Sequence, residues 1–268
     1  MHYNRDTREF KGCLSSQRKK TENNMNRSVQ SPPAWHPDEI SFLEQEGALA
    51  PGINAIPLER VRERWIHRTL REVFLSPTGY VAKRYCHFPG RKDYRKVWQR
   101  EHRALVRLRG LNVPQSAGFI TVQHSANVTG ILHVRSLLPG SGVQWRSNSD
   151  IERLADLLSS FHSRLVVTLD PQKENFIFTS LRDRDIGFID FGRARVFHSR
   201  NPLMLFNIGK ELAKLGIEGG LTEPQFAAFI GHYDKKTTYS RGQKAIISAS
   251  MRYWQRRHNR RLKQTKNH

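Results

Sequence analysis

The chain has 268 residues and carries 45 Lys and Arg residues against 24 Asp and Glu residues, a formal net charge of +21. A hydrophobic fraction of 37% and an aromatic fraction of 10% are enough for a packed core, which excludes a wholly disordered protein. Two cysteines exclude a disulfide framework and a four-cysteine zinc site. No apolar run approaches the roughly 18 residues of a membrane span, and the N-terminus lacks the apolar stretch of a secretory signal. We therefore expect a soluble, basic, cytoplasmic protein with an anionic partner.

Strand and turn patterns dominate the first half of the chain. Residues 1–34 are polar and rich in Asn, Ser, Lys and Arg, which predicts a flexible basic arm. Strands are then expected on both sides of a turn at residues 76–79, within residues 68–85. Apolar side chains at helical spacing predict one helix over residues 93–108. Further strands are expected at residues 120–122 and 131–138.

Helical patterns dominate the second half. A helix is expected to begin at Ser149 or Asp150, with an apolar side that continues to Phe161. Two short apolar runs, 176–178 and 186–189, are separated by a polar turn and predict a hairpin. Strands early and helices late favour an α+β, bilobal fold. Its predicted parts are a flexible arm (1–34), a sheet-bearing N-lobe (35–138), a mainly helical C-lobe (139–234) and a basic C-terminal helix or tail (235–268).

The C-terminal segment carries much of the excess charge. Residues 235–268 contain eleven Lys and Arg residues and no Asp or Glu. Residues 246–254 add an apolar stripe, so the first part of the segment can form an amphipathic helix. A basic amphipathic segment is typical of surfaces that meet anionic lipid or nucleic acid, although a solvated helix and tail has the same composition.

Four polar features follow one another in an order that suits phosphoryl transfer. The first is Lys83 at the end of a predicted strand, and the second is Glu101 in the predicted helix. The third is the run Asp170 to Asn175 between a helix and a strand, and the fourth is Asp190 in Ile-Asp-Phe-Gly after the next strand. A restrained lysine can hold phosphates, Asn and Asp oxygens can hold Mg²⁺, and a carboxylate such as that of Asp170 can take the proton of an acceptor hydroxyl.

With these features, the chain resembles the protein-kinase-like superfamily and, within it, the bacterial lipopolysaccharide core kinases that phosphorylate heptose or Kdo. In that family a helix is followed by an Asp-Pro-x-x-x-Asn-Phe-Ile loop, a hairpin and an Ile-Asp metal motif. Residues 161–195 have the same order, and the resemblance covers roughly residues 65–215. It implies that Asp170 is the catalytic base, that Lys83, paired with Glu101, contacts the ATP phosphates, and that the Mg²⁺ ligands are Asn175 and Asp190.

The turn before Lys83 departs from the family pattern. It contains one glycine, Gly79, in place of a glycine-rich loop, so the nucleotide contacts are expected from Ser76, Thr78, Gly79 and Val81. Only a short segment separates Gly192 from a helix expected at residues 208–215, which leaves little room for a large substrate lobe. This favours a small acceptor or a glycolipid over a folded protein. Candidate acceptor-binding residues are Lys173, Arg193 and Arg195.

The resulting hypothesis is an enzyme that transfers the γ-phosphate of ATP, with Mg²⁺ as cofactor, to a sugar hydroxyl of the lipopolysaccharide inner core. Its nucleotide is expected between the two lobes. The partners would be the anionic glycolipid and, through the basic C-terminus, the inner face of the cytoplasmic membrane. The alternatives are a small atypical Ser/Thr protein kinase, an aminoglycoside-type phosphotransferase, a catalytically silent kinase fold and a basic nucleic-acid-binding protein. Cationic aminoglycosides suit a +21 protein poorly, and no motif here indicates specific nucleic-acid binding.

Overall fold

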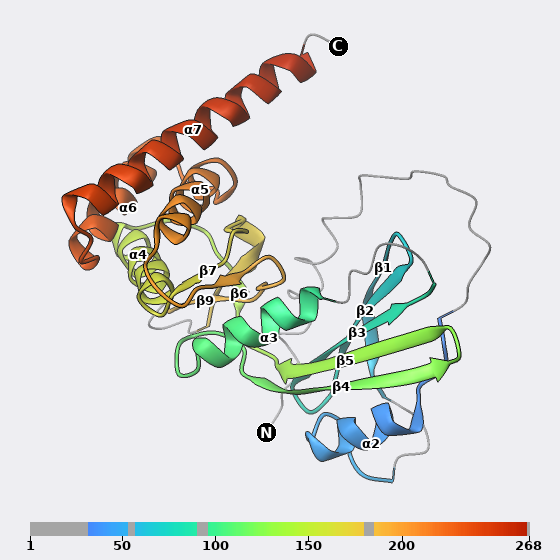
Figure 1. Ribbon diagram of the computed structural model, residues 1–268. Coiled ribbons are helices and arrows are strands. Elements are labelled where there is room, and N and C mark those ends of the chain that lie inside the picture. Colours follow the sequence, from blue (N-terminus) through green and yellow to red (C-terminus); the bar gives the residue numbers. More distant parts are fainter. Residues whose placement is uncertain (1–31, 53–56, 90–95, 180–184, 267–268) are drawn as a thin grey trace. The chain divides into compact units, whose positions relative to one another are not determined.

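A computed structural model describes residues 32–52, 57–89, 96–179 and 185–266, with side chains up to residue 260 (Figure 1). The described part is a mixed α+β protein with six α-helices and a five-stranded antiparallel sheet. It forms two compact units. Unit 1 comprises the described residues up to His102 together with Pro114–Leu137, and unit 2 comprises Arg103–Val113 together with the described residues from Leu138 onward.

Unit 1 is built on the five-stranded sheet, whose strand order is β1-β2-β3-β5-β4. Every neighbouring pair is antiparallel, and irregularities in register occur near Arg60 in β1 and near both ends of β4. The strands are β1 (Glu59–Ile66), β2 (Thr69–Leu75), β3 (Tyr80–His87), β4 (Ser116–Ser125) and β5 (Val128–Ser136).

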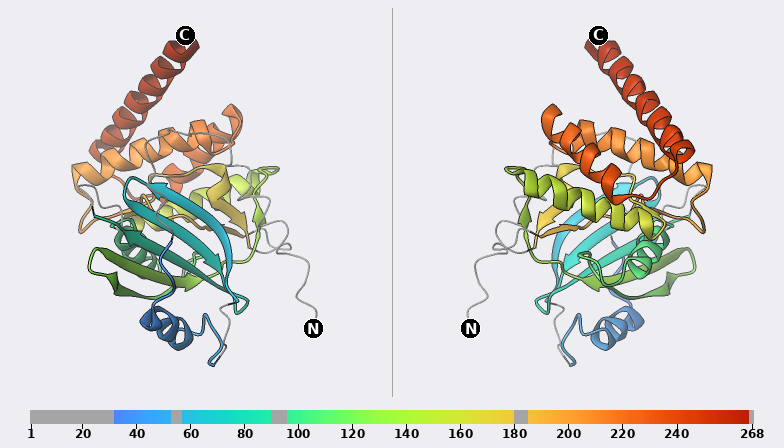
Figure 2. Two further views of the ribbon diagram at one scale, coloured as in Figure 1. Left: turned by 90° about the vertical axis from the view of Figure 1, so that its right-hand side faces the viewer. Right: turned by 90° about the vertical axis from the view of Figure 1, so that its left-hand side faces the viewer.

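Both faces of β3 are covered, which explains why six consecutive residues of this strand are buried. On one face, α2 (Pro37–Gln45) packs Leu43 into a cluster that includes Ala82, Leu132 and Val134. The other face packs against the first part of α3 (Val97–Arg107), where Trp98 joins a cluster with residues of β3 and β5. Because side chains alternate along a strand, Val81, Lys83 and Tyr85 point to the α3 face. Figure 2 shows the twisted sheet with α2 lying along one side.

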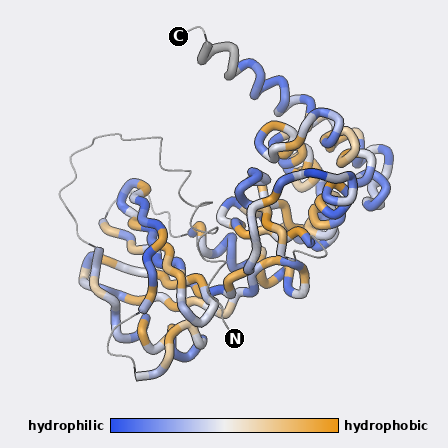
Figure 3. The backbone as a smooth tube through the Cα atoms, turned by 180° about the vertical axis from the view of Figure 1, so that it is seen from behind, coloured by the Kyte–Doolittle hydropathy of each residue, from blue (hydrophilic) through white to orange (hydrophobic). Residues whose placement is uncertain are grey.

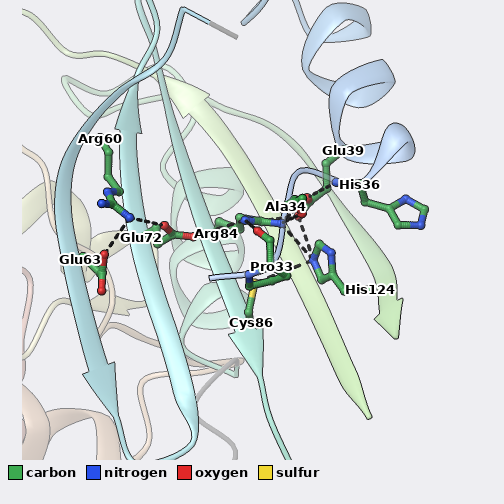
Figure 4. Close-up of polar contacts among 10 residues, drawn as sticks. All are labelled: Pro33, Ala34, His36, Glu39, Arg60, Glu63, Glu72, Arg84, Cys86 and His124. Carbon is green, nitrogen blue, oxygen red and sulfur yellow. Dashed lines mark hydrogen bonds and ion pairs between the residues drawn. The ribbon is translucent and has the colours of Figure 1, made fainter. Parts of the chain in front are cut away.

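Arg84 anchors α2 and the segment before it to the sheet (Figure 4). Its buried guanidinium donates to both oxygens of Glu39, at 3.0 and 2.9 Å, and more weakly to Glu72 at 3.4 Å. It also donates to the carbonyl oxygens of Pro33, at 2.8 Å, and Ala34, at 2.6 Å. These contacts hold the end of the predicted arm, whose residues 1–31 lie outside the described part of the chain.

Unit 2 surrounds an aromatic core. Helix α4 begins after the N-cap Ser147, whose side chain accepts the Asp150 amide in a capping box. The rings of Phe161, Phe176, Phe188 and Phe191 form edge-to-face pairs. The elements of unit 2 beyond α3 are β6 (Ser141–Gly142), α4 (Asn148–Ser163), β7 (Val166–Val167), the 3₁₀ turn Lys173–Asn175, β8 (Phe176–Phe178), β9 (Ile186–Phe188), β10 (Arg195–Val196), α5 (Pro202–Glu218), α6 (Glu223–Lys236) and α7 (Arg241–Lys266).

Helices α5 and α7 cross closely at Gly209. A Cβ atom on this glycine would overlap the backbone of α7 at Ile247 and the side chain of Ser250. Ser250 Oγ donates to the Phe206 carbonyl at 2.6 Å across the same crossing. Toward its C-terminal end α7 is strongly hydrophilic (Figure 3). Among the described helices, none combines the length and apolar character that a membrane span needs.

The local predictions are confirmed in the described residues. The turn at 76–79 joins β2 and β3, and the hairpin is β8–β9. The strand at 120–122 lies in β4, and the one expected at 131–138 corresponds to β5, which ends at Ser136. The expected helices correspond to α3, α4, α5 and α7, although residues 93–95 of the first lie outside the described part. No prediction was made for helices α2 and α6 or for strands β1, β6, β7 and β10. The lobes predicted at 35–138 and 139–234 stay a prediction.

Candidate functional site

Lys83 and Glu101 form a buried ion pair on the α3 face of the unit 1 sheet. Lys83 comes from the central strand β3, and Glu101 occupies the apolar stripe of α3 that also carries Trp98. The Lys83 ammonium group donates to both carboxylate oxygens, at 2.6 and 2.8 Å. The carboxylate side chain is fully buried and the lysine side chain is 5% exposed. The predicted pair is therefore present, and it places a fixed cation in the middle of the sheet.

Two further side chains from β5 surround this carboxylate. Arg135 Nε lies 3.3 Å from Glu101 Oε1, and His133 faces Lys83 across the β3–β5 pair. Burial by itself would raise the pKa of Glu101, but Lys83, Arg135 and His133 outweigh it and lower this pKa to about 2. Glu101 is thus ionised and shared between two cations.

His133 is kept neutral by its surroundings. Burial lowers its pKa to about 4, and the positive charges of Lys83 and Arg135 oppose the attraction of Glu101. His133 Nε2 lies 3.0 Å from Ser116 Oγ, which also contacts His102 at 2.9 Å. Its buried Nδ1 has no hydrogen-bond partner among the described residues.

The turn before Lys83 has its polar groups engaged in local structure. Ser76 Oγ donates to the Ala48 carbonyl, and Thr78 Oγ1 donates to the Gly47 carbonyl at 2.8 Å. Gly79 has a φ of +85°, which a side chain would disfavour. Both hydroxyl hydrogens thus tie the turn to residues 47–48. That Ser76, Thr78 and Gly79 contact phosphates stays a prediction, as does a nucleotide contact from the buried Val81.

In unit 2, Glu211 of α5 holds the backbone immediately before Asp170. One oxygen of this buried carboxylate accepts the amides of Thr168, at 2.8 Å, and Leu169, at 3.1 Å, together with the Thr168 hydroxyl. The other oxygen lies 2.6 Å from His162 Nε2. Leu169 has a φ of +60°, a strained conformation for a non-glycine residue. Asp170 therefore follows a backbone segment that Glu211 fixes in an unusual turn.

Asp170 is held on one side and open on the other. Its Oδ1 pairs with Lys214 Nζ of α5 and lies 3.5 Å from Arg193 Nη1. Its Oδ2 has no hydrogen-bond donor within reach in the part of the chain that the structure describes. The side chain is 14% exposed. A carboxylate that is oriented through one oxygen and free at the other can accept a proton from a ligand.

Asn175 and Asp190 lie at the same end of the β8–β9 hairpin. Phe176 pairs with Phe188, and the Ile189 amide donates to the Asn175 carbonyl at 3.0 Å, so the segments that bear the two side chains are neighbours. The Asn175 side-chain amide nitrogen donates to the Asp170 carbonyl at 2.8 Å. This bond also ties Asn175 to the loop that presents Asp170.

The donor atoms at this end of the hairpin suit a hard cation. Because its nitrogen is used on Asp170, the Asn175 amide presents its oxygen as the remaining polar atom. Asp190 accepts the Gly192 amide on Oδ1 at 2.9 Å, which leaves its Oδ2 for a ligand. Mg²⁺ is held in proteins by one or two such oxygens together with water and substrate phosphates. The described residues contain no cluster of three or more His, Cys, Asp and Glu side chains that could hold a metal ion.

The three candidate acceptor residues take different places in unit 2. Arg193 reaches Asp170, as described above, and its side chain is 66% exposed. Arg195 is exposed on β10, opposite Val167 of β7. Lys173 lies with its aliphatic chain against Gly220, and no polar contact joins it to Asp170 among the described residues.

Glu211 and Lys214 were not predicted from the sequence, although both act on the Asp170 loop. A signal for Glu211 exists, since it is a carboxylate within the buried apolar stripe of α5 that contains Ile208, Leu212 and Leu215. Nothing in the sequence singles out Lys214, because a partly exposed lysine on a helix is an ordinary feature. Comparison of the chain with protein-family models and with curated proteins finds no match.

Proposed function

We propose that the protein is an ATP-dependent phosphotransferase with a bilobal, protein-kinase-like fold, which transfers the γ-phosphate to a sugar hydroxyl of an anionic glycolipid such as the lipopolysaccharide inner core. The observation that carries the proposal is the arrangement around Asp170. An oriented carboxylate, the amide oxygen of Asn175 and a carboxylate oxygen of Asp190 come from one loop and the hairpin that follows it. Phosphoryl transfer needs a group that accepts the proton of the acceptor hydroxyl and oxygen atoms that hold Mg²⁺, and these three groups can take those roles.

Each group has a distinct role in the proposed reaction. Lys83, fixed by Glu101, would neutralise charge on the nucleotide phosphates. Asp170 Oδ2 would accept the hydroxyl proton as the acceptor oxygen bonds to the γ-phosphorus and the bond to the ADP oxygen breaks. Asn175 and Asp190 would hold Mg²⁺, which when bound neutralises phosphate charge. Glu211 and Lys214 would position Asp170 without contacting substrate.

The charge of the protein supports an anionic acceptor at an anionic surface. The net charge is +21, and residues 235–268 contribute eleven bases and no acid. The exposed side chains of α7 include Arg252, Arg256 and Arg260. Cationic helices are attracted to anionic leaflets, and salt weakens the attraction. The proposed location is therefore the inner face of the cytoplasmic membrane.

The test uses purified full-length protein, γ-labelled ATP, Mg²⁺ and lipopolysaccharide that lacks core phosphate. We expect label in the glycolipid with the natural protein. Asp170→Asn and Asp190→Ala are expected to lower the rate by about a hundredfold or more, because they remove the proton acceptor and a metal ligand. Asp156→Asn is the matched control, since Asp156 is a surface carboxylate paired with Lys236. Circular dichroism verifies that all variants are folded.

The other outcomes separate the alternatives. Label that appears only in protein identifies a protein kinase. Binding of Mg·ATP without any labelled product rejects the glycolipid as acceptor, and absence of nucleotide binding points to a catalytically silent fold. Unchanged turnover in either Asp170→Asn or Asp190→Ala contradicts the proposed chemistry.

A further inference from the structure

Three arginines of unit 2 act electrostatically on Lys210, and we call the four side chains the cation cluster: Arg193, Arg195, Lys210 and Arg257. Arg193 is the member that contacts Asp170. Lys210 lies one helical turn before Lys214 on α5, so both project from the same side of this helix. Lys210 Nζ is 4.4 Å from the centre of the Trp254 ring on α7, and the guanidinium carbon of Arg257 is 5.2 Å from the same ring. One indole ring thus contacts two cations.

The members of the cluster repel one another. Burial lowers the pKa of Lys210, and the charges of Arg195, Lys214, Arg193 and Arg257 lower it further. Among the described residues, no carboxylate lies within ion-pair distance of Lys210, Arg195 or Arg257. Like charges without a counter-ion raise the free energy of the folded protein, and a bound anion would offset this cost.

Helix packing keeps the cluster together. Lys210 follows Gly209, where α5 and α7 make the close crossing described above. The Ser250 bond to Phe206 joins the same two helices, and the Trp254 ring lies 6.4 Å from the Phe206 ring. Lys210 and Arg257 therefore belong to a closely packed pair of helices, which lowers the ordering cost of binding a ligand.

We propose that the cation cluster is a binding site for phosphate groups, flanked by the Trp254 ring, and that it holds an anionic part of the acceptor while a hydroxyl is presented to Asp170. Two observations define the ligand class. The cluster has several unneutralised cations, which suits a ligand with more than one phosphate, and Arg193 of the cluster also reaches Asp170. The role as acceptor site rests on the proposed function, but phosphate binding does not.

The test compares two double variants that remove the same charge from unit 2. Lys210→Met/Arg257→Gln breaks the cluster, and Lys235→Met/Arg241→Gln is the matched control. Arg241 precedes Arg257 by sixteen residues of α7, about 24 Å along a helix. Calorimetry at one fixed salt concentration measures binding of glucose 1,6-bisphosphate, with Mg·ADP present to occupy a nucleotide site. The same proteins are also measured with phosphatidylcholine vesicles that contain or lack phosphatidylglycerol.

We expect the cluster variant to weaken binding about tenfold and the control variant to change it less than about twofold. If the cluster variant weakens binding of the bisphosphate alone, the ligand is a free sugar phosphate. If it weakens binding of the phosphatidylglycerol vesicles alone, the ligand is a lipid headgroup. Equal weakening in both double variants, or no binding of either probe, overturns the proposal. These measurements need no turnover. If the cluster binds phosphate and the protein has no kinase activity, this inference stands while the proposed function fails.

Discussion

The Glu101 carboxylate is the counter-charge of two cations, Lys83 and Arg135. Its carboxylate contacts Lys83 at 2.6 Å and Arg135 at 3.3 Å in a buried setting. Removing the carboxylate therefore takes a counter-charge from two cations, whereas removing Lys83 leaves Glu101 with Arg135. Breaking a buried pair is costly mainly because of the charge that is left behind.

We predict that Glu101→Gln lowers the free energy of unfolding by about 3 kcal/mol and Lys83→Met by about 1 kcal/mol. Urea denaturation at pH 7 measures both. Arg100→Met is the control for Lys83→Met, since Arg100 is exposed on the same helix as Glu101. Equal losses, or a larger loss in Lys83→Met, would contradict the view that Glu101 is shared.

His133 gives unit 1 a defined dependence on pH. Its pKa is about 4 in the folded protein and about 6.5 in the unfolded chain. Above pH 6.5 the residue is neutral in both states. As the pH falls toward 4, the unfolded chain binds a proton that the folded protein does not, so stability is lost across this interval.

The expected loss from His133 is about 3 kcal/mol between pH 6.5 and pH 4. His133→Gln should flatten the pH profile of the unfolding free energy in this interval. His198→Gln, at an exposed position, should leave the profile unchanged. If the unfolding free energy changes with pH equally in the natural protein and in His133→Gln, the folded protein also protonates His133 in this interval, and the prediction is wrong.

At the scale of elements, the crossing of α5 and α7 sets the geometry around Lys210. Two helix glycines allow a direct test, because Gly209 lies in this crossing and Gly231 lies in α6 with no atom near its missing Cβ. Gly231→Ala is predicted to stabilise the protein by about 0.5–1 kcal/mol through helix propensity. Gly209→Ala has the same propensity gain but is predicted to destabilise by about 2 kcal/mol, because the methyl group meets the α7 backbone. Thermal unfolding of both variants checks the difference, and stabilisation by Gly209→Ala would show that the helices separate easily.

Elements that depend on nearby residues were predictable from the sequence, and those that depend on distant partners were not. The turn at 76–79 and the β8–β9 hairpin are local structures with recognisable turn residues and apolar runs. Helix α2 was missed because its stability comes from the sheet, with Glu39 bonded to Arg84, 45 residues further along. The Lys83–Glu101 pair was predicted from resemblance, whereas Glu211 and Lys214 reach Asp170 only through the packing of α5.

At the scale of the molecule, the surplus positive charge is unevenly distributed along the sequence. Residues 235–268 have no acid, and the turns of α7 that Figure 3 colours before its grey end are hydrophilic. The helix buries Ile247 and Ser250 where it crosses α5, while Arg252, Arg256 and Arg260 stay exposed. One helix thus combines an anchored half with a cationic half.

We predict that the protein binds vesicles containing phosphatidylglycerol and that the dissociation constant rises about tenfold or more between low salt and 0.3 M salt. Vesicle sedimentation with full-length protein measures this. Replacing Arg252, Arg256 and Arg260 by Gln should weaken binding about tenfold, because each exposed cation contributes attraction to the anionic surface. The matched control replaces Arg100, Arg103 and Arg107 of α3 by Gln, which removes the same charge from another exposed helix surface. If the α3 variant loses as much affinity as the α7 variant, net charge alone governs binding and α7 is not the contact surface.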